Sequence, residues 1–421
     1  MTIQVPTGMS RRHFMGHLAG ASALAGTAMS FTSSMAQSAE TLKKNHKACI
    51  LMWMGGGPST MDIWDLKPGA PTGGEFKPIQ TAASGVEICE HMPMMAKVMD
   101  KVSLVRSMST READHGRGRY YMHTGYVPNP NMTHPSYGAV LAHELANPEN
   151  PIPPFISVGG ASEGPGFLGM AYAPLVVGTN GDIRNLKSKV DDARLMQRMQ
   201  MLSAIESGFI NQNRGESAVD HAKILDKTLS LMTSSQMAAF KVDGEDAKTK
   251  ERYGTSGFGR GLLMARRLVE AGVPFVEVDY GGWDNHADIF TTLRDTKLPL
   301  IDQAMSALVE DLSARDMLKD TAIVWMGEFS RTPRINATTG RDHWARSWST
   351  MIGGGKIKGG RAVGATNEDG TSVITEPYSA EDLMASVCQA LDISLKTTFT
   401  SKTGRPMKIA NGGKVINELF S

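Results

Sequence analysis

Short apolar runs alternate with segments of helical periodicity along most of this chain. The runs "KACILMWMGGG", "DKVSLVRSM", "PIPPFISVG", "VPFVEVDY" and "TAIVWMG" have the length and the flanking turn residues of buried strands. Between them, segments such as "SYGAVLAHELA" and "GFGRGLLMARRLVEAG" place apolar residues at the spacing of amphipathic helices. This alternation predicts an α/β fold, with a mostly parallel central sheet and helices on both faces.

One stretch, residues 185–253, departs from the alternation. Its segments "NLKSKVDDARLMQRMQMLSAIESGF" and "SAVDHAKILDKTLSLM" have helical spacing and few strand signals. We therefore expect a helical insertion at about 185–253, within one α/β domain that spans 37–421. The insertion lies between two regions that carry candidate site residues, and the sequence leaves open whether it forms a lid.

The N-terminus carries a targeting signal. Arg11 and Arg12 form a twin-arginine pair, a weakly apolar Ala/Gly/Met stretch follows, and the Ser-Met-Ala sequence at 34–36 suits a signal peptidase. We predict a twin-arginine signal peptide over 1–36, with the twin-arginine export machinery as a partner and a periplasmic or secreted location. No later stretch has the roughly 18 uninterrupted apolar residues of a membrane helix, so no membrane span is expected in the mature chain.

Charge and cysteine content exclude several classes of protein. The net charge of +1 over 421 residues gives no basic bias, so nucleic acid is not expected as a partner. None of the three cysteines belongs to a CxxC pair, which excludes a thiolate zinc cluster and a disulfide framework. The motif HExxH is also absent from the sequence, which disfavours a metallopeptidase.

Carboxylates, imidazoles and guanidinium groups follow the predicted strands. In open parallel sheets ligands bind at the carboxyl ends of the strands, so residues just past each strand are the site candidates. They are Ser59, Thr60, Asp62, Asp114, His115, Arg117, Arg119, Asp284, His286, Glu328, Arg331, Asp342 and His343. Carboxylate oxygens and imidazole nitrogens bind ions such as Zn²⁺, Mn²⁺ and Ca²⁺. Because a guanidinium fork suits a tetrahedral anion, the pattern predicts a divalent-metal site beside an anion site.

Two short motifs carry the metal hypothesis. In "GGWDNHADIF", Asp284 and His286 are two apart, so an extended backbone would point both to one face and let them share a cation. In "GRDHW", Asp342 and His343 are adjacent, so one would bind the metal while the other orients it. An isolated Asp-x-His sequence is more often a solvated turn. The hypothesis therefore depends on several such residues following strands together.

Several motifs, taken in order, resemble one known family. They are "GGGPSTMDIWDLKP", "HTGYVPNPNMTHPSYGAVLAHEL", "GGWDNH", "GEFSRTP", "GRDHW" and "GGKVINELF". From about Ala48 to the C-terminus the chain resembles the exported family named "domain of unknown function 1501", which is similar to sulfatases and to the alkaline phosphatase superfamily. The resemblance implies one sulfatase-like α/β domain and a divalent metal ion at the strand ends, with Zn, Mn and Ca as candidates.

The resemblance also implies roles for single residues. His115 stands where sulfatases keep a nucleophilic Cys, and Arg119 matches the Arg of that motif. His115 is therefore expected to act as a ligand, nucleophile or acid, unless Ser59 or Thr60 supplies a hydroxyl or a water attacks directly. The implied metal ligands are Asp284, His286, Glu328 and His343, with Asp342 as ligand or support and Asp62 as the nearest match to an acidic residue after the first strand.

Two functions from different classes follow. The first is an exported metal-dependent hydrolase of sulfate or phosphate esters, with a small molecule or a glycan ester as substrate. The alternative is a non-catalytic binding or assembly protein on a sulfatase-like scaffold. The alternative gains support because position 115 holds neither Cys nor Ser.

Overall fold

The computed structural model describes most of the chain after the N-terminal segment. The described residues are 47–184, 186, 188–212, 221, 225, 227–232 and 234–421. The predicted signal peptide, residues 1–36, lies outside them, so export stays a prediction. Among the helices within the described ranges, none has both the length and the apolar character needed to cross a bilayer.

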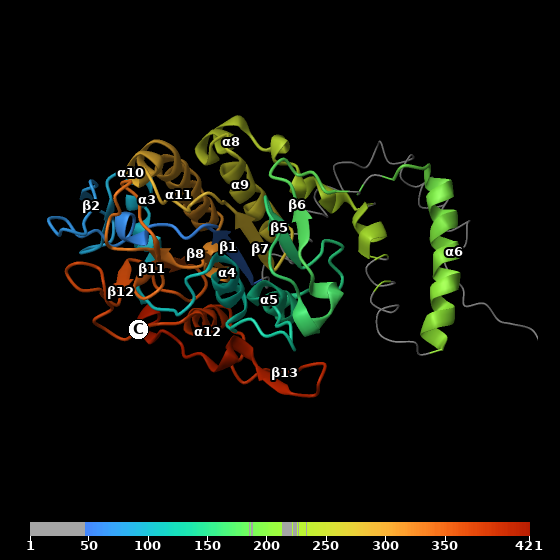
Figure 1. Cartoon of the computed structure of the whole chain (residues 1–421). Helices are drawn as coiled ribbons and strands as arrows, with labels where there is room; N and C mark the ends of the chain where they lie inside the picture. Colours follow the sequence, from blue (N-terminus) through green and yellow to red (C-terminus); the bar gives the residue numbers. More distant parts are fainter. Residues whose placement is uncertain are drawn as a thin grey trace, which may run out of the picture. The chain divides into compact units, whose positions relative to one another are not determined.

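An eight-stranded sheet forms the centre of the fold, in the order β12-β4-β11-β8-β1-β7-β5-β6 (Figure 1). The strands are β1 (Ala48–Trp53), β4 (Val102–Met108), β5 (Phe155–Val158), β6 (Leu175–Val177), β7 (Phe275–Asp279), β8 (Thr321–Met326), β11 (Trp348–Gly353) and β12 (Arg361–Val363). Strand β11 pairs antiparallel with β4 and β8, while the other neighbouring pairs are parallel. The mostly parallel sheet is confirmed.

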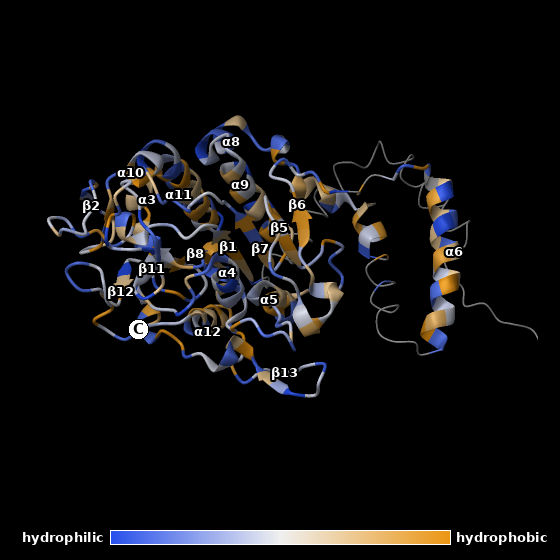
Figure 2. Ribbon diagram, in the orientation of Figure 1, coloured by the Kyte–Doolittle hydropathy of each residue, from blue (hydrophilic) through white to orange (hydrophobic). Residues whose placement is uncertain are grey.

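Helices cover both faces of the sheet. The α-helices are α3 (Pro93–Ala96), α4 (His115–Thr124), α5 (Tyr137–Leu145), α6 (Asp192–Asn211), α8 (Ala247–Tyr253), α9 (Gly257–Glu270), α10 (Ile289–Thr292), α11 (Leu298–Ala314) and α12 (Ala380–Ala390). Successive residues of a strand point to opposite faces. Ile50 and Met52 of β1 pack in one apolar core with α9 and α11, and Cys49 and Leu51 pack in a second core with α5 and α12. Figure 2 shows the strand β5 as strongly apolar, as a strand covered on both faces must be.

Short strand pairs lie outside the central sheet. They are β2 (Pro78–Gln80) with β3 (Glu87–Cys89), β9 (Ser330–Arg331) with β10 (His343–Trp344), and β13 (Thr398–Thr400) with β14 (Pro406–Lys408). These strands have two or three residues each, too few for a hydrophobic period to show in the sequence.

Helix α4 was not predicted. It begins at His115, where the side chain of Asp114 accepts a backbone N–H of the first turn, and it ends before Gly125 in the left-handed conformation. Its low apolar content hides it from a periodicity argument. The helix places His115, Arg119 and His123 at successive positions i, i+4 and i+8, on one face.

The predicted insertion at 185–253 is helical where it is described. It contains α6, α8 and short 3₁₀ segments, and no strand occurs among the residues described in this range. Its boundaries as a unit, and a lid function, stay predictions.

Candidate metal centre

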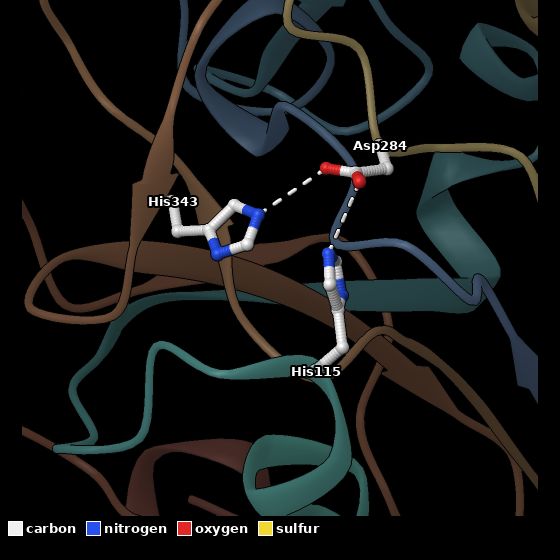
Figure 3. A group of neighbouring side chains, drawn as sticks. All are labelled: His115, Asp284 and His343. Carbon is white, nitrogen blue, oxygen red and sulfur yellow. Dashed lines mark hydrogen bonds and ion pairs between the residues drawn. The ribbon is translucent and has the colours of Figure 1, made fainter.

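Four side chains meet beyond the carboxyl ends of three parallel strands. His115 opens α4 after β4, and both Asp284 and His286 lie in the loop after β7. His343 lies in β10, which pairs with β9 in a register that sets His343 opposite Arg331. Figure 3 shows the rings of His115 and His343 pointing toward Asp284 from different segments. The sheet therefore brings together residues that are far apart in sequence, as the strand-end argument predicted.

The carboxylate of Asp284 is the centre of this group. Its Oδ2 atom lies 3.3 Å from Nε2 of His115. Its Oδ1 atom lies 2.9 Å from Nε2 of His286 and 3.2 Å from Nε2 of His343. The side chains of Asp284 and His286 are 45% and 46% exposed, so the group is open to solvent on one side. We call Asp284, His115, His286 and His343 the metal centre.

The other nitrogen of each imidazole ring faces an oxygen. These contacts are His115 Nδ1 to Glu328 Oε1 at 2.7 Å, His286 Nδ1 to Asp342 Oδ1 at 2.8 Å, and His343 Nδ1 to the Ala113 carbonyl oxygen at 2.8 Å. Because carboxylate and carbonyl oxygens accept hydrogen bonds, each Nδ1 carries the proton and each Nε2 keeps a lone pair. A support of this kind behind each ring is typical of metal-binding histidines.

Protons alone do not satisfy this arrangement. Nε2 of His286 can accept a hydrogen bond from Nη1 of Arg331 at 3.3 Å, but it also lies 3.2 Å from Nε2 of His343, and with both Nδ1 atoms protonated two lone pairs would face each other there. In addition, Nε2 of His115 and Oε2 of Glu328 are buried and make no hydrogen bond. A cation among three lone pairs and a carboxylate would resolve the conflict. The residues present therefore fit a divalent metal ion.

A buried guanidinium stabilises the charged form of Asp284. Arg331 places Nη2 2.6 Å from Asp284 Oδ1, while its Nε donates to the Gly57 carbonyl at 2.7 Å and Nη2 also donates to the Gly56 carbonyl. Burial by itself would raise the pKa of Asp284, but the hydrogen bond and the charge of Arg331 outweigh it and lower this pKa to about 2. Asp284 is thus an anion at any physiological pH.

Two glycines let the backbone around the centre approach closely. A Cβ atom on Gly118 of α4 would lie 3.1 Å from the Phe329 ring and 3.2 Å from Cβ of Glu328. A Cβ on Gly340 would lie 2.0 Å from the carbonyl carbon of His286. Position 340 therefore requires glycine, whereas a side chain at 118 would need Phe329 and Glu328 to give by a few tenths of an ångström. Glycines beside charged residues, in "HGRGR" and "TTGRDHW", were the sequence signal for this packing.

The comparisons with known proteins can be set beside this geometry. Residues 46–420 match the family model described as "Protein of unknown function (DUF1501)". The chain belongs to this DUF1501 family. No curated protein matches the sequence. The family resemblance inferred from the motifs is confirmed.

Solved structures resemble this DUF1501 chain at low identity. The PsFucS1 sulfatase from Pseudoalteromonas sp. is 11% identical, with 85% of this chain and 70% of that chain covered and a TM-score of 0.38. A protein in the alkaline phosphatase superfamily from Vibrio parahaemolyticus is 10% identical, with coverage of 88% and 69% and a TM-score of 0.37. The phosphonate monoester hydrolase of Agrobacterium radiobacter is 13% identical, with coverage of 89% and 77% and a TM-score of 0.38.

Two predicted residues lie together outside the metal centre. Ser59 donates its hydroxyl to Asp62 at 2.6 Å, and Asp62 accepts Nε and Nη2 of Arg341 at 2.8 Å each. All three side chains are buried. Asp62 therefore braces the loop that carries His343, through the arginine that precedes Asp342 by one residue.

The arginines predicted for an anion are held by carboxylates. Nη1 of Arg119 lies 3.6 Å from Asp279, Nη2 lies 3.7 Å from Glu277, and Nε lies 3.4 Å from Glu163. Arg117 pairs with Glu112 at 2.6 Å and 2.8 Å. The structure thus brings together His115, Asp284, His286 and His343, sets Glu328 and Asp342 behind them, and leaves Arg119, Ser59 and Asp62 in other contacts.

Proposed function

We propose that this chain is an exported metal-dependent hydrolase of sulfate or phosphate esters. The observation that carries the proposal is the metal centre itself, where three Nε2 atoms and one carboxylate converge at the carboxyl ends of parallel strands. One side of this group is open to solvent, which gives an ester access. The resemblance of the sequence motifs to sulfatases supports the choice of substrate class.

Some residues of the site would bind the metal ion, and others orient these ligands. Asp284, His115, His286 and His343 would hold the ion, which when bound polarises the oxygens of an ester and makes a water molecule more acidic. Glu328 and Asp342 hold the Nδ1 protons of His115 and His286, and so fix the direction of both lone pairs. The charge of Arg331 keeps Asp284 ionised in the site.

Water is the nucleophile that this site favours. In the part of the chain that the structure describes, no hydroxyl or thiol side chain is hydrogen-bonded to the side chains of the metal centre. Ser59 donates to Asp62, and Thr60 donates to Ser330 at 3.0 Å. Attack by water breaks the bond between the sulfur or phosphorus atom and the ester oxygen, and yields an alcohol and inorganic sulfate or phosphate.

The same observation supports the alternative, a non-catalytic binding or assembly protein. The experiment that separates them is a screen of the purified exported protein on aryl sulfates and aryl phosphates with added Mn²⁺, Zn²⁺ or Ca²⁺, alongside its metal content. We expect hydrolysis that falls by at least about 100-fold in His286→Ala, because a ligand matters at least as much as its support. The control is His143→Ala, since His143 contacts Glu144 on α5, away from the centre.

Each outcome of this screen decides between the two functions. Hydrolysis that depends on His286 and survives in His143→Ala supports the enzyme. Bound metal without turnover of any ester supports the binding protein. Export is tested separately: replacing Arg11 and Arg12 by Lys should leave the protein in the cytoplasm, and unchanged export would contradict the twin-arginine route.

A further inference from the structure

We infer that the metal centre is a three-histidine, one-carboxylate site that selects a zinc-type transition-metal ion over Ca²⁺ and Mg²⁺, with His115 as a ligand. The inference goes beyond the proposed function, because it concerns the choice of ion and holds whether or not an ester is the substrate. It rests on the identity, direction and spacing of the donor atoms.

The donor atoms are mostly nitrogen. His115, His286 and His343 each turn a lone pair on Nε2 toward Asp284, which supplies the oxygen. Ca²⁺ takes about six to eight oxygen ligands, and Mg²⁺ keeps several waters on an octahedron of oxygens. Imidazole suits Zn²⁺ and its neighbours in the transition series, and three histidines occur at catalytic zinc sites.

The spacing of the donors also suits a small tetrahedral ion. Asp284 Oδ1 lies 2.9 Å from His286 and 3.2 Å from His343, Asp284 Oδ2 lies 3.3 Å from His115, and His286 lies 3.2 Å from His343, while one ligand atom each of His115, Asp284 and His343 lie within 4.8 Å of one another. Bonds of about 2.0–2.1 Å to a tetrahedral zinc ion place the ligands about 3.3 Å apart. Ca²⁺, with bonds of about 2.3–2.6 Å and more ligands, needs a wider ring.

The other carboxylates stand behind the rings. Glu328 Oε1 meets Nδ1 of His115 and also accepts the backbone N–H of Gly56 at 2.9 Å. Asp342 meets Nδ1 of His286. The two nitrogens of an imidazole point away from each other, so neither of these contacting oxygens lies on the Nε2 side where the lone pairs meet. This arrangement assigns His115 to the metal and assigns Glu328 and Asp342 to the support of its ligands.

Metal competition on the full chain tests the inference. Protein stripped with a chelator is titrated calorimetrically with Zn²⁺, Co²⁺, Ca²⁺ and Mg²⁺, and then dialysed against Zn²⁺ with about 100-fold more Ca²⁺ before its metal content is measured. We expect one zinc ion per chain to be retained, and the strong visible absorption of tetrahedral Co²⁺ to appear in the cobalt form. Equal or tighter binding of Ca²⁺ would overturn the inference.

Variants test the role of each residue by affinity, without an activity assay. His115→Ala should weaken zinc binding by at least about 100-fold and change the Co²⁺ spectrum, whereas Asp342→Asn should weaken it by about 10–100-fold and keep the spectrum. Circular dichroism checks folding, and Asp342→Asn, an exposed position, serves if His115→Ala fails to fold. An unchanged affinity in both variants contradicts the assignment. Zinc binding without ester hydrolysis would defeat only the proposed function, and hydrolysis that needs Ca²⁺ would defeat only this inference.

Discussion

Two clusters of similar composition lie at neighbouring strand ends and share helix α4. The metal centre takes His115 from the start of α4. The second cluster, which we call the Glu277 network, takes Arg119 and His123 from the same helix face and joins them to Ser162, Glu163, Glu277 and Asp279. Both contain imidazole and carboxylate groups, and in both an arginine, Arg331 or Arg119, contacts a carboxylate. The residue types therefore do not tell a metal site from a structural network.

The difference lies in how donors meet acceptors. In the Glu277 network, Nδ1 of His123 faces the Arg119 carbonyl at 2.9 Å and Nε2 faces Glu277 at 3.2 Å, while Ser162 donates to the other oxygen of Glu277. Burial would raise the pKa of Glu277, but His123 and Arg119 outweigh it and lower this pKa. Both nitrogens of His123 and the Ser162 hydroxyl face acceptors there, and Arg119 lies 3.4–3.7 Å from three carboxylates. In the metal centre, Nε2 of His286 and Nε2 of His343 lie 3.2 Å apart, and this mismatch supports the proposal that the centre binds a cation.

The largest expected effect is the loss of stability when the Glu277 network is broken. Glu277→Ala removes a fully buried carboxylate and leaves His123 and Arg119 without their partner, which should cost about 3–5 kcal/mol of unfolding free energy. Urea unfolding of the metal-free protein measures it. Zinc affinity, measured where the variant is still folded, should stay unchanged. A stable Glu277→Ala protein that has lost zinc would reverse the roles of the two clusters.

The sequence predicted most of the fold because the apolar pattern within a segment indicates whether that segment forms a buried strand or helix. Apolar runs and helical periods revealed β1, β4, β5, β7, β8, α5 and α9. Helix α4 was not predicted because its sequence contains two glycines and few apolar residues. Strand β11, which is antiparallel and follows the His343 loop, was not among the predicted strands.

The sequence predicted which residues belong to the site better than it predicted the role of each residue. Asp284, His286 and His343 follow strands in the sequence, so their meeting could be expected. That Glu328 supports His115, and that Arg331 pairs with Asp284, depends on hydrogen-bond directions that only the folded chain defines. One signal was available for Arg119: the charged Glu277 within the apolar run "VPFVEVDY" required a cationic partner.

A smaller effect tests the position of Asp62, which the sequence offered as a ligand and the structure pairs with Arg341. Asp62→Asn keeps the shape but removes the charge from a buried pair, so it should lower the unfolding free energy by about 1–3 kcal/mol. Zinc affinity should change less than in Asp342→Asn, because Asp62 reaches the centre only through the loop of Arg341. A large loss of zinc affinity with unchanged stability would instead make Asp62 part of the metal centre.

The smallest effect concerns the pH dependence of stability, to which Asp284 and Asp279 should contribute with opposite sign. The pKa of Asp284 is lowered from 3.8 to about 2, so Asp284 contributes stability that is present above about pH 4 and is lost as the pH falls toward 2. Burial raises the pKa of Asp279, and the charge of Arg119 only partly opposes this. Asp279 therefore contributes stability that is present below pH 3.8 and is lost as the pH rises through its raised pKa. Urea unfolding of the metal-free protein from about pH 2 to 6, with Asp284→Asn and Asp279→Asn, resolves the two components.

Each substitution should remove one pH-dependent component from the plot of unfolding free energy against pH. Asp284→Asn should flatten the acid side, by a small amount because its side chain is half-exposed and water screens the pair with Arg331. Asp279→Asn should remove the decline that appears as the pH rises above 3.8, because an amide does not ionise. If both variants alter the profile in the same direction, the opposite pKa shifts of Asp284 and Asp279 are contradicted.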